Sequence, residues 1–211
     1  MINYKHVVFD WDGTLADTYP VISGAYNAAF DALGIPRIPY EEIKRITGTL
    51  QNREMLGAVF GERKAEASEA LYKYIEEHHM DVKALPGAKE LLEFCRDKGL
   101  DIYLVTNKTR KFVDKEMAKL GFDVFFKKTA AAREYEQDKP HPATTHSIFD
   151  GKIPIAETIL MIGDGDADVQ TAKSYGNAKS VIYDPEGTYK GSTPDYMVKS
   201  LLDIKAILEK K

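Results

Sequence analysis

One local pattern occurs three times after residue 86, and it limits the folds available to the chain. In each case a segment with helical periodicity ends at a glycine, and a short apolar run follows. Glycine just past a helix supplies the left-handed cap that ends it. Alternating helices and strands predict a parallel sheet with helices on both faces. The units are 91–98, Gly99 and 102–105; 112–120, Gly121 and 124–126; and 169–175, Gly176 and 180–182.

Two more apolar runs, 6–9 and 159–162, have the length of strands and no polar alternation. Such runs are typical of strands buried on both faces. Together with the three repeated units, they predict an α/β fold built on a doubly wound parallel sheet. The tail from 200 to 211 is expected to close the fold as an amphipathic helix.

Residues 16–83 show helical patterns and no clear strand, so they interrupt the α/β pattern as an insertion. Helices are expected over about 17–33, from near Pro39, and over 63–79, where apolar residues recur at 3.6-residue spacing. The expected organisation is a core domain of residues 1–15 and 84–211 and a helical cap domain of residues 16–83.

Composition excludes several classes of partner. The formal net charge of −4 argues against nucleic acid, whose phosphate backbone calls for a basic surface. No apolar run approaches the roughly 18 residues that span a bilayer, and no signal-peptide pattern opens the chain, so a cytoplasmic protein is expected. The single cysteine, Cys95, lies in a helical apolar stripe and is expected to be a buried thiol.

Polar and acidic residues follow three of the expected strands. In a doubly wound sheet, ligands bind beyond the carboxyl ends of the strands, so these residues are expected to meet at one edge. The three strand ends carry Asp10 and Asp12, Thr106 and Asn107, and Asp164 and Asp168.

Asp10 and Asp12 are two residues apart, so their side chains can project to one side of the strand end. Carboxylates held close together repel one another unless a cation lies between them or one takes a proton. Mg²⁺ prefers oxygen ligands and suits this position, and Asp164 and Asp168 can complete the site. Gly13 permits close approach of the backbone to an anion.

Three further residues can contact an anion at the same edge. Thr106 offers a hydroxyl and an amide, and Asn107 offers a side-chain amide. Lys139 supplies a cation, and Pro140 restricts the backbone that carries it.

Four stretches of the sequence resemble motifs of one family. Asp-Trp-Asp-Gly-Thr-Leu at 10–15 resembles the first motif of the haloacid dehalogenase superfamily, and Val-Thr-Asn at 105–107 resembles the second. Lys139–Pro140 resembles the third motif, and the acidic stretch 163–168 resembles the fourth. Four motifs in the family's order are far more specific than any one of them. The helical block resembles the family's cap, and the chain is most similar to the phosphoglycolate phosphatase-like branch.

The resemblance implies Mg²⁺-dependent hydrolysis of a small-molecule phosphate monoester. Asp10 would attack phosphorus and form an aspartyl-phosphate, and Asp12 would protonate the leaving oxygen and later take a proton from water. The carboxylates of Asp10 and Asp164, with the backbone carbonyl of Asp12, would hold Mg²⁺. Asp168 would support the metal or its waters, or orient Lys139.

The same resemblance implies which groups grip the phosphoryl group. Thr106 and Lys139 would contact its equatorial oxygens, where its charge lies. Asn107 and the backbone amides of Trp11 and Gly13 are further candidates for phosphate contact.

Alternative activities stay open at this point. A phosphomutase of the β-phosphoglucomutase type would share the nucleophile and the proton donor, and a phosphate-binding regulator would need neither. Phosphonate cleavage would need a cap lysine placed for a Schiff base, for which Lys44 is available. Halide removal is disfavoured, because Asp12 is present. The sequence gives no expectation for the oligomeric state.

The cap segment 47–50 resembles the loop that faces substrate in capped relatives, and two arginines flank it. Arg45 or Arg53 is therefore a candidate to hold a substrate carboxylate. A hinge between core and cap is expected near 16–17 and 82–85, where the chain crosses between them.

Overall fold

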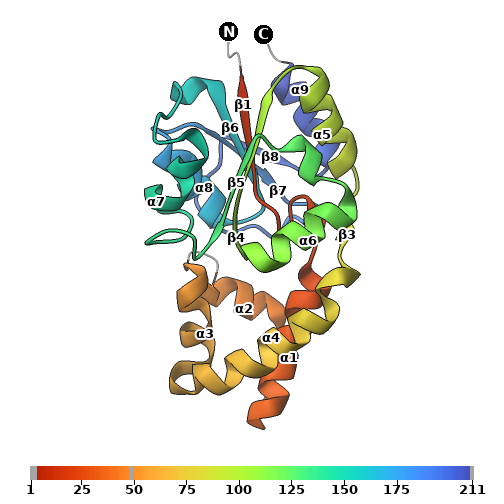
Figure 1. The fold of residues 1–211 in the computed structure, drawn as a ribbon, viewed down its shortest axis with the longest axis vertical. Coiled ribbons are helices and arrows are strands. Elements are labelled where there is room, and N and C mark those ends of the chain that lie inside the picture. The colour runs from red at the N-terminus through yellow and green to blue at the C-terminus, as the bar shows by residue number, and fades with distance from the viewer. Residues whose placement is uncertain (1–3, 48–49, 210–211) are drawn as a thin grey trace.

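A six-stranded parallel sheet runs through the upper part of the molecule (Figure 1). The computed structural model describes residues 4–47 and 50–209. The strands are β1 (His6–Phe9), β4 (Asp101–Thr109), β5 (Lys128–Ala132), β6 (Ile159–Gly163), β7 (Lys179–Tyr183) and β8 (Tyr196–Val198). Their order is β5-β4-β1-β6-β7-β8, and every neighbouring pair is parallel. The chain thus winds outward from β1 in both directions, which confirms the predicted fold class.

Alternate residues of the central strands point to two separate apolar clusters, one on each face of the sheet. In β1, Val7 and Phe9 join the first cluster, whereas Val8 joins the second. In β6, Leu160 and Met161 divide in the same way. A strand buried on both faces has no polar side, which explains why its sequence is an unbroken apolar run.

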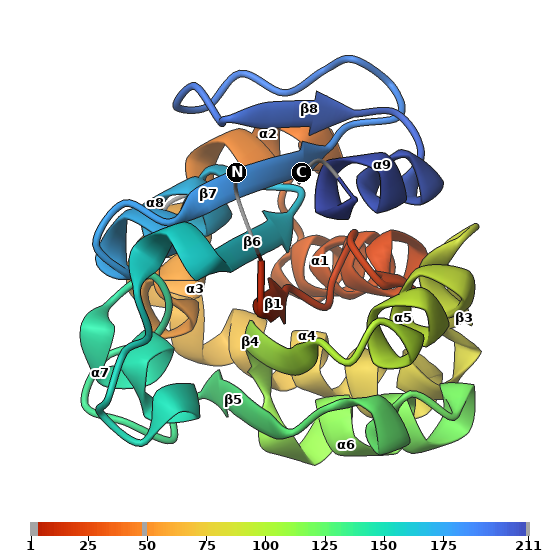
Figure 2. The same cartoon turned by 90° about the horizontal axis from the view of Figure 1, so that it is seen from above.

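Helices cover both faces of this sheet (Figure 2). The first cluster includes residues of α5 (Ala88–Asp97), α6 (Arg110–Leu120) and α9 (Ile204–Leu208). The second includes residues of α8 (Asp166–Ser174) and of the 3-10 helix His146–Phe149, which follows α7 (Pro142–Thr145). Cys95 is buried in α5, and burial raises the pKa of its thiol to about 12, so the expected inert thiol is confirmed.

Four helices form a separate group beyond the carboxyl ends of the strands (Figure 1). They are α1 (Tyr19–Leu33), α2 (Tyr40–Thr47), α3 (Asn52–Phe60) and α4 (Lys64–His78). Their apolar faces meet around a third cluster that includes Tyr26, Phe30, Phe60 and Leu71. Within residues 4–47 and 50–209, no helix combines the length and apolar character needed to cross a bilayer.

The chain enters and leaves this helical group through a two-stranded antiparallel ribbon. β2 (Ala16–Asp17) pairs with β3 (Lys83–Ala84). Each strand has only two residues, which is too short to give a sequence pattern. The ribbon lies where the sequence analysis expects a hinge.

Two local predictions are wrong. Residues 124–126, expected as a strand, follow a different path: Asp123–Phe125 is a 3-10 turn, and Val124 is 78% exposed. The strand is instead β5, whose alanines pair with β4: Ala130 with Val105 and Ala132 with Thr109. The expected closing helix is also shorter, because Leu201–Asp203 is a 3-10 turn before α9.

Candidate active site

The ammonium group of Lys139 lies between two buried carboxylates at the carboxyl edge of the sheet. Its Nζ is 2.6 Å from Asp10 Oδ1 and 2.7 Å from Asp168 Oδ1, and it also donates to the Val105 carbonyl at 3.3 Å. Burial alone would lower the pKa of Lys139, but the two carboxylates outweigh burial and hold the pKa above its ordinary value. Lys139 is therefore a fixed cation at the end of β1.

Three carboxylates meet beside Lys139. One oxygen each from Asp10, Asp164 and Asp168 lies within 4.8 Å of the other two. Burial raises the pKa of Asp10 above its ordinary range, and burial together with Asp168 raises that of Asp164 to about 6. A divalent cation would offset this repulsion, and a set of carboxylate oxygens is what Mg²⁺ prefers. The chemistry of these donors therefore fits a hard divalent metal.

Asp168 has few free lone pairs left for a metal. Its Oδ2 accepts the amides of Asp164 at 3.1 Å and Gly165 at 3.0 Å, and its Oδ1 accepts from Lys139. This approach requires a glycine at 163, because a Cβ there would lie 1.9 Å from the Asp168 carboxyl carbon. Of the roles left open in the sequence analysis, the geometry favours orientation of Lys139.

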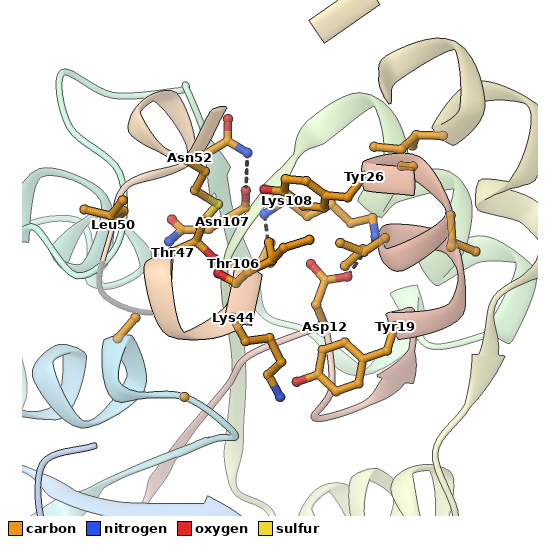
Figure 3. Close-up of a pocket in the computed structure, with 18 of the residues that line it drawn as sticks. Asp12, Tyr19, Tyr26, Lys44, Thr47, Leu50, Asn52, Thr106, Asn107 and Lys108 are labelled. Carbon is orange, nitrogen blue, oxygen red and sulfur yellow. Dashed lines mark hydrogen bonds and ion pairs between the residues drawn. The ribbon is translucent and has the colours of Figure 1, made fainter. Parts of the chain in front are cut away.

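The Asp12 carboxylate contacts a second lysine, Lys108 (Figure 3). Lys108 Nζ is 2.8 Å from Asp12 Oδ1 and 3.1 Å from Glu116 Oε1. Glu116 Oε2 accepts the Trp11 indole N–H at 2.7 Å. Burial alone would lower the pKa of Lys108, but Asp12 and Glu116 outweigh it and raise the pKa. Asp12 therefore faces a charged lysine that Glu116 anchors from behind.

Trp11 and Gly13 help to build the site, and phosphate contact by their backbone amides stays a prediction. The Trp11 side chain is fully buried. Gly13 has a φ of 75°, and its amide donates to the Ala16 carbonyl at 2.9 Å, so a phosphate contact would have to replace that bond. A Cβ at Gly13 would lie 2.3 Å from the Tyr19 hydroxyl, which donates to Asp164. Glycine is therefore needed for Tyr19 to reach the acidic cluster.

Thr106 and Asn107 lie at the same edge, in β4. Thr106 is buried, and its hydroxyl accepts the Lys108 amide at 3.1 Å. Asn107 donates from Nδ2 to the Lys139 carbonyl at 3.0 Å, while its Oδ1 is buried without a hydrogen-bond partner. Asn107 therefore joins β4 to the backbone of the lysine loop.

Lys44 reaches the acidic edge from α2. Its Nζ lies 3.9 Å from Asp164 Oδ2 and 4.3 Å from the centre of the Tyr19 ring. Figure 3 shows its amine beside the Tyr19 hydroxyl.

Neither cap arginine is placed to hold a substrate. Arg45 pairs with Glu42 on the surface, and Arg53 donates from Nε and Nη2 to Asp138, each at 3.1 Å. The expected carboxylate clamp is therefore not found, because each arginine already has an acidic partner. Gly48 and Thr49, in the expected substrate-facing loop, lie outside the described residues; Thr47 and Leu50 line the cavity.

The contact of Arg53 is part of a larger joint between α3 and the loop before Lys139. Gln51 accepts the Asp138 amide at 3.1 Å, and Asn52 donates to the Asn107 carbonyl at 2.9 Å. We call Gln51, Asn52 and Arg53 the α3 latch. It ties the helical group to the two segments that carry Asn107 and Lys139.

Sequence reasoning missed three residues of the site: Tyr19, Lys108 and Glu116. Glu116 carried a usable signal, because it occupies the buried face of α6 between Val113 and Met117. A glutamate in an apolar stripe needs a buried partner. Lys108 and Tyr19 had no such signal, since their positions depend on how distant segments meet.

Comparisons with known proteins agree with this architecture. The profile of the haloacid dehalogenase-like hydrolase family matches residues 7–181. A phosphoglycolate phosphatase of Vibrio parahaemolyticus is 26% identical over 97% of this chain and 96% of its own. One of Pseudomonas putida is 29% identical over 81% of this chain and 66% of its own.

Solved structures match over nearly the whole chain. A protein from Haemophilus somnus, described as a predicted phosphoglycolate phosphatase, superimposes with a TM-score of 0.84 at 22% identity, covering 98% of each chain. A haloacid dehalogenase-like hydrolase from Streptococcus pneumoniae gives 0.82 at 21% identity, covering 99% of this chain and 100% of the other. At these identities, the likeness supports the fold.

Proposed function

The chain belongs to the haloacid dehalogenase-like hydrolase family, and from that premise we propose that it hydrolyses small-molecule phosphate monoesters through an aspartyl-phosphate on Asp10. One observation carries the proposal. Asp10 and Asp12, Lys139, and Asp164 come from three separate stretches of the chain, and all four residues line one cavity. The curated relatives named phosphoglycolate phosphatases support the reaction class.

Asp10 is the nucleophile in this proposal. Its carboxylate is held at the end of β1 by Lys139, so one oxygen is fixed while the other can approach phosphorus. Attack forms the oxygen–phosphorus bond of the aspartyl-phosphate and expels the alcohol. Lys139 then lies beside the charge that builds on the phosphoryl oxygens, where a preorganised cation stabilises the transition state most.

Asp12 carries the proton in both half-reactions. It gives a proton to the departing alcohol oxygen, then takes one from the water that hydrolyses the intermediate. Its carboxylate lines the same cavity as Asp10, and Lys108 fixes its direction. Thr106, which lines the same cavity, would donate to a phosphoryl oxygen.

Mg²⁺ would be held by Asp10 and Asp164 with the backbone carbonyl of Asp12. When bound, the ion supplies the positive charge that lets an ionised carboxylate approach an anionic ester. Asp168 contributes by holding Lys139 and the amides of Asp164 and Gly165 in place.

We also propose that residues 16–83 act as a cap that covers the site during the reaction, with residues 1–15 and 84–211 as the catalytic core. The separate apolar cluster of α1–α4 supports this division, as does the two-stranded ribbon at the crossing. Closure would keep water away during the first step. Location in the cytoplasm stays a prediction.

The test is phosphate release from p-nitrophenyl phosphate. We expect turnover that requires added Mg²⁺ and is lost in EDTA. Asp10→Asn should reduce kcat by at least about 10³-fold, because the nucleophile is gone. Asp150→Asn is the matched control, since Asp150 is an exposed partner of Lys128 far from the site. Normal turnover by Asp10→Asn would refute the mechanism.

A further inference from the structure

The cavity above the acidic edge is walled mainly by apolar side chains. Its volume is about 260 Å³, and it reaches into the third apolar cluster, between the cap helices. Its floor is polar and belongs to the site already described. Its walls come from α1, α2, α3, α4 and α6, and include Ile22, Ile43, Met55, Leu71, Ile75 and Phe112.

Each cation that lines the cavity, among the residues the structure describes, already faces a carboxylate. Lys139 lies between Asp10 and Asp168, and Lys108 lies between Asp12 and Glu116. Lys44 is nearest to Asp164 and covers the Tyr19 ring. All three ammonium groups are therefore next to the carboxylates of the polar floor, and Figure 3 shows Lys44 and Lys108 near Tyr19 and Asp12.

The two cap arginines also offer no cation to a ligand in the cavity. Arg45 and Arg53 are absent from the cavity wall as described, and each is paired elsewhere. A substrate carboxylate among the apolar walls would thus leave water without a cation beside it, because Lys44, 3.9 Å from Asp164, belongs to the acidic edge. Burial of an unpaired charge is strongly unfavourable, whereas burial of an alkyl group is favourable.

We infer that the cavity selects phosphate monoesters whose alcohol is compact and apolar, over esters whose alcohol carries a carboxylate. This inference rests on the proposed function, and it names the leaving group. A cavity of about 260 Å³ lies at the small end of ligand sites, which favours a compact alcohol beside the phosphoryl group.

A matched pair of esters tests this directly. Isobutyl phosphate and 2-phosphoglycolate have nearly the same branched shape, and both release a primary alcohol. They differ in two methyl groups against two carboxylate oxygens. With Mg²⁺ present, we expect kcat/KM at least about tenfold higher for isobutyl phosphate, because each buried methyl contributes about fourfold. Equal values, or a preference for 2-phosphoglycolate, would overturn the inference.

Two pairs of variants test the walls. Met55→Lys places a cation on the α3 wall, whereas Met55→Leu keeps that wall apolar. We expect Met55→Lys to shift the ratio of the two kcat/KM values toward 2-phosphoglycolate by at least about tenfold, and Met55→Leu to shift it less than about twofold. Ile75→Lys and Ile75→Leu repeat the comparison on α4, with thermal unfolding to verify that each variant folds.

Ligand binding separates failure of the inference from failure of the proposed function. The Asp10→Asn protein, which should bind without turnover, is titrated with each ester in Mg²⁺ by calorimetry. Tighter binding of isobutyl phosphate supports the inference even if the wild-type protein releases no phosphate, in which case only the proposed reaction fails. Tighter binding of 2-phosphoglycolate, or binding of neither ester, overturns the inference while hydrolysis of p-nitrophenyl phosphate still supports a phosphatase.

Discussion

The floor and the walls of the cavity are built by opposite physical means. On the floor, Lys139, Asp10 and Asp168 are buried and paired at 2.6–2.7 Å, so each charge fixes the position of the next. On the walls, apolar side chains of the cap helices meet through non-directional packing. Directional contacts define one geometry, whereas apolar packing tolerates changes of shape. The floor is therefore suited to one reaction, and the walls are suited to variation in the substrate.

The two regions also differ in how they are held together. The floor belongs to the sheet, whose central strands are fully buried. The contacts that attach the walls to it include the two-residue strands of the ribbon and the α3 latch. In the latch, Arg53 is 41% exposed although its partner Asp138 is buried, and solvent weakens an ion pair on its exposed side. The cap is thus the part of the molecule whose position is easiest to change.

The largest expected effect tests this difference between floor and walls by removing one cation from each region. Lys139→Met should lower kcat/KM for p-nitrophenyl phosphate by about 10³-fold or more, because the preorganised charge is lost at the phosphoryl group. Lys44→Met, the same change at the cap rim, should cost less than about tenfold. Steady-state kinetics measure both.

Lys139→Met should also destabilise the fold, since Asp10 and Asp168 lose their shared partner. Breaking a buried ion pair costs about 3–5 kcal/mol, which chemical denaturation can detect. Measurement in Mg²⁺ should limit this loss, because a bound ion would offset part of the repulsion between the carboxylates. Equal kinetic effects of the two variants would show that floor and rim do not differ as proposed.

The floor was largely predictable from the sequence, and the walls were not. Asp10 and Asp164 follow unbroken apolar runs, and such runs end at the same edge of a parallel sheet, so their proximity needs no side-chain detail. The strand was wrongly expected at 124–126 because aromatic and β-branched residues have a higher β-strand propensity than the alanines of β5. Pairing with β4 decides in favour of the alanines.

Long, flexible side chains account for most of the other errors. The sequence offered Arg53 as a substrate ligand, but its partner, Asp138, is 85 residues away. Which of several acidic groups an arginine meets depends on how two domains approach. Tyr19 and Lys108 were missed for the same reason, since each contacts a residue at least 96 positions distant.

A smaller effect is expected from the residue behind the proton carrier. Glu116→Gln weakens the anchor of Lys108, so Asp12 loses part of its fixed direction. We expect kcat to fall by about tenfold and KM to change less than about twofold, since the substrate contacts stay. Complete loss of a general acid costs about 10²–10⁴-fold, which sets the upper bound.

The control for Glu116→Gln is Glu90→Gln, an exposed glutamate in the first turn of α5. A rise in KM with unchanged kcat would place the role of Glu116 in substrate binding instead. If Glu116→Gln lowers thermal stability without changing kcat, Glu116 has only a structural role.

The smallest expected effect concerns the α3 latch and uses the two arginines that the sequence could not tell apart. Arg53→Ala removes two hydrogen bonds to the buried carboxylate of Asp138, which precedes Lys139. The loss of about 1 kcal/mol should lower kcat/KM by about fivefold, because the closed cap is less populated. Arg45→Ala removes only an exposed pair with Glu42 and should change kcat/KM less than about twofold.

Salt separates a latch from a ligand. If Arg53 only docks the cap, the difference in kcat/KM between wild type and Arg53→Ala should become smaller as salt rises toward 1 M. At that concentration the Debye length is about 3 Å, so charges are strongly screened. The difference should also be the same for isobutyl phosphate and 2-phosphoglycolate, because a docking contact does not sense the alcohol. A loss confined to 2-phosphoglycolate would mean that Arg53 leaves Asp138 to bind the substrate, and the cap would then select its substrate by charge after all.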